Sequence, residues 1–197
     1  MCYNGCMFFN NAHCLVTDCG SVPADDAGRL EYLRLIENAR RDFGLKLAAY
    51  ALLPDRTLLY FVTPGADLHS VMGGINRDRT LPGYAAGHCK YKLIQPEKLS
   101  AALARFIHTS PVKAGLAAKP EDYKWSSAAQ YLGLAEGPAD KDIVLATLGD
   151  NPEAQLAKYS EFMAEPVPGK FWRPFDKNRD AVLGDRDFMT AHSPHQK

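Results

Sequence analysis

The sequence from residue 45 to residue 63 decides the fold, and it reads Leu-Lys-Leu-Ala-Ala-Tyr-Ala-Leu-Leu-Pro-Asp-Arg-Thr-Leu-Leu-Tyr-Phe-Val-Thr. Two apolar runs, Leu45–Leu53 and Leu58–Val62, lie on either side of Pro54-Asp55, which is a pair of residues typical of turns. Short apolar runs bounded by a turn predict buried strands. We therefore expect a central hairpin, which the rest of the chain has to cover.

The segments around this hairpin alternate between strand and helix patterns. Residues 12–18 predict a strand, and Asp25-Asp26 begin an amphipathic helix that carries arginines near its end and stops at Gly44. After the hairpin we expect a helix, a short strand and a third helix, over Leu68–Ile75, Tyr91–Ile94 and Leu99–His108. The order β-α-β-β-α-β predicts an α+β fold of the ferredoxin-like type, an antiparallel sheet with helices on one face.

The remainder of the chain is predicted to be mostly helical. Ser110-Pro111 and Asn151-Pro152 each have the N-cap and first-residue pattern of a helix start. We also expect helices over 123–132 and 140–148, irregular backbone over 166–173 and a frayed end over the last ten residues. The sequence therefore predicts an α+β domain over residues 1–117 and a helical extension, packed on it, over residues 118–197.

The composition is that of a globular domain with an appended part. The chain has 197 residues, of which 46% are apolar and 23% charged, enough for a substantial core. No run reaches the roughly 18 apolar residues of a membrane-spanning helix. The first residues lack the basic start and apolar stretch of a signal peptide. We therefore expect a cytoplasmic protein without membrane attachment.

The charges balance overall but are unevenly distributed along the chain. There are 23 basic and 23 acidic residues, yet residues 74–124 carry nine basic and four acidic ones, a net charge of +5. The middle third is therefore a candidate surface for a polyanion. The alternative is that these are scattered, solvated lysines and arginines.

The five cysteines do not form the pattern of a disulfide framework, because their number is odd and the expected compartment is reducing. Four of them fall within the first 19 residues, close to His13, where they could hold zinc or an iron–sulfur cluster: Cys2, Cys6, Cys14 and Cys19. Their Cys-x3-Cys and Cys-x4-Cys spacings differ from the paired Cys-x2-Cys of zinc ribbons. We favour small buried side chains and exposed thiols instead.

Four segments occur in a distinctive order, namely Ala49–Asp55, Arg105–Leu116, Pro120–Ser127 and Val182–Phe188. Together they resemble the REP-associated tyrosine transposases, which are single-strand transposases with a His-hydrophobic-His metal motif. The resemblance extends from the first strand to residue 188. It implies a strand whose two histidines hold a divalent cation such as Mg or Mn, and a tyrosine on the later helix that attacks a DNA phosphate.

The positions that would carry this chemistry are replaced. Where the family has His-x-His, this sequence has Arg-Thr-Leu at 56–58, and where the family has Arg-Tyr-Ile-x-x-Asn-Pro it has Arg-Phe-Ile-His-Thr-Ser-Pro at 105–111. An arginine stays cationic, and neither leucine nor phenylalanine has a donor atom. The resemblance thus implies a degenerate reaction centre, with no intact catalytic residue, metal ligand or cofactor, at Arg56, Leu58, Phe106 and Ser110.

Arg56 could instead contact a phosphate directly, because a guanidinium donates two parallel hydrogen bonds. We predict a surface that binds nucleic acid without cleaving it, formed by Arg56, Arg77, Arg79, Lys90, Lys92 and Lys113. Its expected partner is single-stranded or hairpin DNA, with RNA as the alternative. The competing interpretation is that Arg56 pairs with Asp55 or another nearby carboxylate.

Two other functions stay open at this point. One is a divergent transposase that still cleaves and joins single-stranded DNA, with Tyr84 or Tyr91 as a relocated nucleophile. The other is a protein-interaction module built from the helical extension and the aromatic cluster Phe171–Phe175. We favour packing roles for these tyrosines and a structural role for His108, and we expect the aromatic cluster to cover the sheet.

Overall fold

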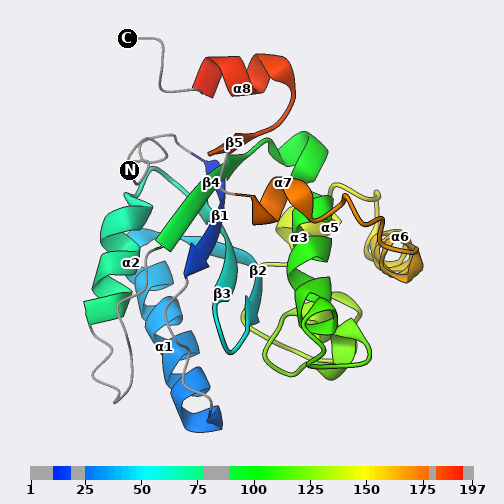
Figure 1. Cartoon of the computed structure of the whole chain (residues 1–197), viewed down its shortest axis with the longest axis horizontal. Helices are drawn as coiled ribbons and strands as arrows, with labels where there is room; N and C mark the ends of the chain where they lie inside the picture. The colour runs from blue at the N-terminus through cyan, green and yellow to red at the C-terminus, as the bar shows by residue number, and fades with distance from the viewer. Residues whose placement is uncertain (1–10, 19–24, 78–88, 178–180, 193–197) are drawn as a thin grey trace.

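The computed structural model describes residues 11–18, 25–77, 89–177 and 181–192. Within them one sheet has the strand order β2-β3-β1-β4-β5 (Figure 1). The strands are β1 Ala12–Asp18, β2 Lys46–Leu52, β3 Thr57–Thr63, β4 Cys89–Ile94 and β5 Val182–Leu183. The first four strands are antiparallel, as predicted, whereas β5 was not predicted and runs parallel to β4. A strand of two residues is too short to show an alternating pattern.

The described helices include four longer ones and several short ones. The longer ones are α1 Asp26–Phe43, α2 Leu68–Arg77, α3 Pro96–Lys113 and α6 Pro152–Ala164. The shorter ones are η1 Pro120–Asp122, α4 Ala128–Tyr131, α5 Asp142–Leu145, α7 Arg173–Asp176 and α8 Arg186–His192. None of the described helices is long and apolar enough to cross a membrane.

The first helix, α1, begins and ends at the residues that the sequence indicates. The Asp25 side chain accepts a hydrogen bond from the Gly28 N–H at 2.8 Å, which satisfies one of the free donors at the helix start. Gly44 ends the helix with φ at 65°, a left-handed conformation that glycine adopts without a Cβ clash.

Helices cover both faces of the sheet, which explains why every residue of β3 is buried. The Tyr32 hydroxyl of α1 lies 3.1 Å from Thr57 Oγ1 on one face, and the Tyr91 hydroxyl donates to Leu68 O of α2 on the same face. Figure 1 shows α1 and α2 together on this side, with α3 across the sheet from them. The ferredoxin-like prediction is confirmed, with both helices of its repeat on one face. The opposite face is covered by α3.

The predicted helix start at Ser110-Pro111 is wrong, because both residues lie inside α3. The Ser110 hydroxyl donates to Phe106 O at 2.6 Å, so it bonds backward along the helix instead of capping a new one. Pro111 lies two residues before the helix ends at Lys113, where the missing N–H leaves only one carbonyl without its helical donor. Burial of this stretch against the sheet outweighs the local pattern.

Two further helix predictions are too long. Of residues 123–132 only Ala128–Tyr131 are helical, because the Trp125 carbonyl accepts from Leu52 N at 2.8 Å and Ser126 forms a bridge with Ala51. Of residues 140–148 only Asp142–Leu145 form an α-helix. The predicted frayed end is also wrong in part, because α8 extends to His192.

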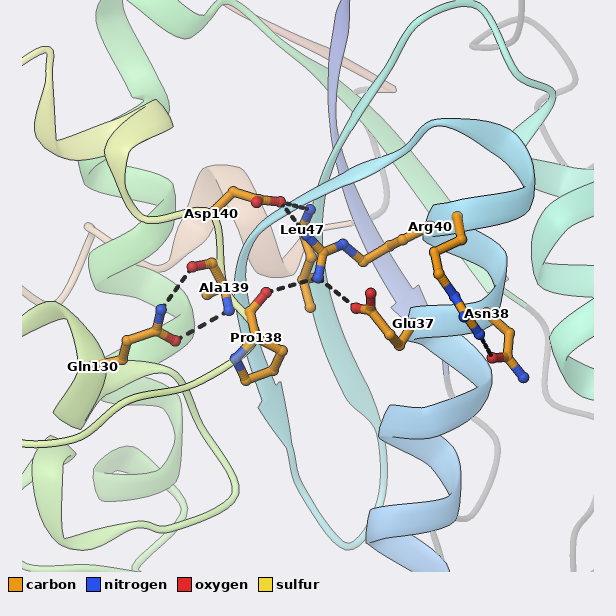
Figure 2. Close-up of polar contacts among 9 residues, drawn as sticks. Glu37, Asn38, Arg40, Leu47, Gln130, Pro138, Ala139 and Asp140 are labelled. Carbon is orange, nitrogen blue, oxygen red and sulfur yellow. Dashed lines mark hydrogen bonds and ion pairs between the residues drawn. The ribbon is translucent and has the colours of Figure 1, made fainter.

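The extension is fastened to the rest of the chain by Asp140. Its Oδ2 accepts from Arg40 Nη2 of α1 at 2.6 Å and from Leu47 N of β2 at 2.8 Å. Arg40 Nη1 also donates to Pro138 O and to Glu37 Oε2 (Figure 2). Arg40 and Asp140 together thus join α1, β2 and the extension.

Candidate nucleic-acid interface

Six of the residues singled out in the sequence, including Phe175 of the aromatic cluster, line one small pocket on the α3 face of the sheet. The pocket has a volume of about 50 Å³, which holds a few water molecules and no nucleobase. Its lining consists of Thr17, Arg56, Leu58, Lys90, Lys92, Phe106, Phe175 and Asp176. Arg56, Lys90 and Lys92 therefore meet at one pocket, as expected for a shared basic surface.

The register of the strands explains this convergence. Thr17 of β1 lies opposite Leu58 of β3 on one side and opposite Lys90 of β4 on the other. Residues directly opposite each other project to the same face of a sheet. Alternation along β4 then places Lys92 on the same face as Lys90.

The Phe106 ring lies in an aromatic cluster that the extension supplies. It stacks on Phe175 of α7 with ring centroids 4.9 Å apart, and Trp172 meets it edge-on at 5.6 Å. Both Leu58 and Phe106 are 2% exposed. Phe175 also lines the pocket beside Thr17 and Leu58 of the sheet, as predicted for an aromatic cluster that covers the sheet, and Phe106 is a core residue.

The residues present do not fit a divalent cation. Arg56 carries a positive charge into the pocket and Leu58 offers no donor atom. The Ser110 hydroxyl is engaged with Phe106 O. Within the described ranges no three His, Cys, Asp or Glu side chains come together as a metal site. Cys14 is buried in the core, whereas Cys2, Cys6 and Cys19 lie outside the described residues.

Arg56 lies between two carboxylates. Its Nε is 3.6 Å from Asp55 Oδ2, and its Nη1 is 4.0 Å from Asp176 Oδ1. The competing interpretation from the sequence, pairing with Asp55 or a nearby carboxylate, therefore describes this conformation. Because 42% of the side chain is exposed, such pairs contribute about 0–1 kcal/mol and do not commit the guanidinium.

The other predicted cations differ in how accessible they are. Lys90 is exposed, whereas Lys92 is buried and its Nζ donates to Lys177 O at 2.5 Å. Lys113 is half-exposed; its Nζ lies 2.6 Å from Asp176 Oδ2 and 4.4 Å from the centroid of the Trp172 ring. Arg77 is the last residue of α2, on the opposite face, and Arg79 lies outside the described residues.

His108 holds α3 against the extension. Its Nδ1 lies 2.6 Å from the Tyr159 hydroxyl and its Nε2 lies 2.7 Å from Ser127 Oγ, and all three side chains are buried. Burial lowers the pKa of His108 to about 3, because the charged ring would lose its hydration. Both ring nitrogens are engaged in buried hydrogen bonds, which confirms the structural role expected from the sequence.

The tyrosines considered as relocated nucleophiles do not reach the pocket where they are described. The Tyr91 hydroxyl points to α2 and donates to Leu68 O, on the face opposite Phe106. Burial raises the pKa of Tyr91, so its phenolate is disfavoured. Tyr84 lies outside the described residues.

Sequence reasoning missed Asp176 and Lys177 as contributors to this interface. The aromatic run Phe171–Phe175 predicted a packing segment, but nothing local identified its partner on α3. An acidic residue directly after an aromatic anchor is the signal that could have indicated a contact with the basic residues.

One solved structure has the same fold, that of a REP-associated tyrosine transposase bound to a REP hairpin. The two superpose with a TM-score of 0.56 at 15% sequence identity, over 73% of this chain and 93% of that one. No protein-family model and no curated protein matches this sequence. The likeness therefore shows the fold alone, an α+β transposase-like fold.

Proposed function

We propose that this chain binds single-stranded or hairpin DNA through its transposase-like fold, without cleaving it, in a regulatory role. One observation carries the proposal: Arg56, Lys90 and Lys92 line the same pocket as Leu58 and Phe106. Cations gathered where a phosphate would be processed favour phosphate binding. The similar solved structure was determined with a hairpin bound, which supports the same ligand class here.

The absence of cleavage is inferred from the chemistry of the pocket. No tyrosine is among its lining residues, so the described pocket lacks the phenolic nucleophile that the resemblance implies. Phe106 has a ring but no hydroxyl, and its ring is covered by Phe175. We therefore treat the proposed site as one that recognises phosphate by charge alone.

A titration with salt tests the proposal. Fluorescently labelled hairpin, single-stranded and duplex DNA, and an RNA hairpin, are titrated with the full chain between about 50 and about 200 mM salt. We expect the logarithm of the binding constant to fall linearly with the logarithm of the salt concentration, by about 0.7 per single-strand phosphate contact. Arg56→Ala and Lys90→Ala are expected to weaken binding and to flatten this slope.

The matched control is Arg34→Ala, because Arg34 pairs with Glu31 on α1, on the other face of the sheet. It removes the same charge as Arg56→Ala and is expected to leave the affinity unchanged. Failure of every oligonucleotide to bind at the lowest salt concentration would remove the proposal.

A covalent assay separates this proposal from the alternative of an active transposase. Labelled hairpin is incubated with the chain and Mg²⁺ or Mn²⁺, then denatured and examined for a protein–DNA adduct. We expect no adduct. An adduct formed by the unmodified chain would establish the enzyme instead.

The interaction-module alternative receives little support, because the aromatic residue Phe175 that would dock a partner is buried inside the chain.

A further inference from the structure

Two consecutive residues of the extension engage most of the cations at the proposed interface. Asp176 lies between Arg56 and Lys113, with Oδ2 2.6 Å from the lysine Nζ and Oδ1 4.0 Å from the arginine Nη1. The backbone carbonyl of the next residue, Lys177, accepts a hydrogen bond from Lys92 Nζ. Of the four predicted cations with described side chains, three thus face residues 176–177.

We infer that Asp176 occupies a phosphate position between Arg56 and Lys113, and that residues 171–177 must move away before nucleic acid can use these cations. This inference rests on the proposed function. A carboxylate and a phosphate accept hydrogen bonds from the same donors, so they compete for one position. A strand phosphate placed beside Asp176 would also face a like charge at close range.

Apolar packing holds the segment in place in addition to its charges. The Phe175 ring is 4% exposed and stacks on Phe106, while Trp172 contacts Phe106 edge-on and lies under the Lys113 ammonium. Salt screens the ion pairs but leaves this packing intact. Nucleic acid therefore has to displace a packed segment, and the measured affinity is reduced by the fraction of molecules in which the segment is closed.

The shape of the segment permits such a movement. The helix α7 has only four residues, and residues 166–172 before it form turns and irregular backbone. The Lys92 side chain bonds to the Lys177 carbonyl. Within the described residues, however, residues 171–177 do not pair with any strand of the sheet. Its release would leave the five-stranded sheet paired as before.

The decisive variant is Asp176→Asn, which removes the charge and keeps the size of the side chain. We expect its affinity for the hairpin to rise about tenfold, because the competing anion is gone. Phe175→Ala weakens the anchor and is expected to raise the affinity as well. The matched control is Glu31→Gln, which removes one negative charge from an exposed ion pair with Arg34 and is expected to change nothing.

Trypsin provides a second measurement on the unmodified chain. Lys170 directly precedes the segment and Lys177 is its last residue, so its release is expected to speed cleavage after these two residues when hairpin is bound. The products are identified by their masses. Cleavage at an unchanged rate in the complex would overturn the inference.

The outcomes distinguish this inference from the proposed function. If Asp176→Asn binds the hairpin no better than the unmodified chain, while Arg56→Ala weakens hairpin binding in both of these backgrounds, the inference fails and the function stands. If neither protein binds the hairpin at the lowest salt concentration, the function fails and takes the inference with it.

Discussion

At the scale of single residues, His108 shows how burial turns an ionisable side chain into a packing element. Its ring is enclosed by Tyr131, Tyr159 and Ser127, and the centroids of the His108 and Tyr131 rings lie 4.7 Å apart. Burial raises the pKa of Tyr131 and of Tyr159, so the whole group is neutral at ordinary pH. The group therefore requires a neutral histidine.

This requirement predicts an acid dependence of stability. The pKa of His108 is about 3 in the folded chain and about 6.5 when unfolded, so between these values the unfolded state binds one more proton. The stability that His108 contributes is complete above about pH 6.5 and falls by about 1.4 kcal/mol per pH unit as the pH decreases. Urea unfolding between about pH 4 and about pH 6.5 measures this slope.

In His108→Gln the slope is expected to fall by that amount, whereas His69→Gln, at an exposed position on α2, is the control and keeps it. Equal slopes in the unmodified chain and in His108→Gln would contradict the assignment.

Phe106→Tyr gives a second prediction at this scale. The new hydroxyl would enter the cluster of Phe175 and Trp172, where a buried polar group without a partner costs about 1–3 kcal/mol. We expect a lower free energy of unfolding in urea and no covalent adduct with a hairpin, with or without Mn²⁺. An adduct would show that Phe106 alone separates this chain from catalysis.

At the scale of elements, the local signals were sufficient wherever they decide a boundary by themselves. The N-cap at Asp25 and the glycine at Gly44 were read correctly because both act on their own helix. The β2–β3 hairpin was also predicted, since its turn and apolar runs are contiguous. Ser110-Pro111 failed because tertiary burial overrides a capping pattern, and β5 was missed because two residues pair only with a strand far away in sequence.

The cap of α1 yields a prediction for this element. Asp25→Ala removes the acceptor for Gly28 N–H and is expected to lower the free energy of unfolding by about 1 kcal/mol. Asp25→Asn retains a side-chain oxygen and is expected to restore most of the loss. Chemical denaturation compares the three proteins, and equal losses in both variants would show that the cap contributes nothing.

At the scale of the whole molecule, the division at residue 117 stays a prediction, but the contacts across it are extensive. Asp140 bonds to Arg40 and Leu47, the Ser126 bridge lies beside β2, and Tyr159 reaches His108. None of these contacts was predictable residue by residue, because each joins positions tens of residues apart. The sequence predicted the cations of the candidate site and an aromatic segment over the sheet, but it did not predict that Asp176 and Lys177 contact those cations.

A truncation tests how far the two parts depend on each other. We expect residues 1–117 alone to lose cooperative unfolding, because β2, α1 and α3 would each expose apolar surface and unpaired polar groups. Near-ultraviolet circular dichroism and urea unfolding measure this against the full chain. A truncated chain with native-like spectra and a sharp transition would show an independent domain.

The strand β5 has a consequence for the behaviour of the chain in crowded solution. The carbonyls of Ala181, just before it, and of Leu183 accept from Leu93 N and Gln95 N and so cover the outer edge of β4, while Ser126 covers the edge of β2. Exposed rims recruit strands from neighbouring copies and seed aggregates. Proteolytic cleavage before residue 181 would therefore free the edge of β4 and promote self-association of the protein well before its core unfolds.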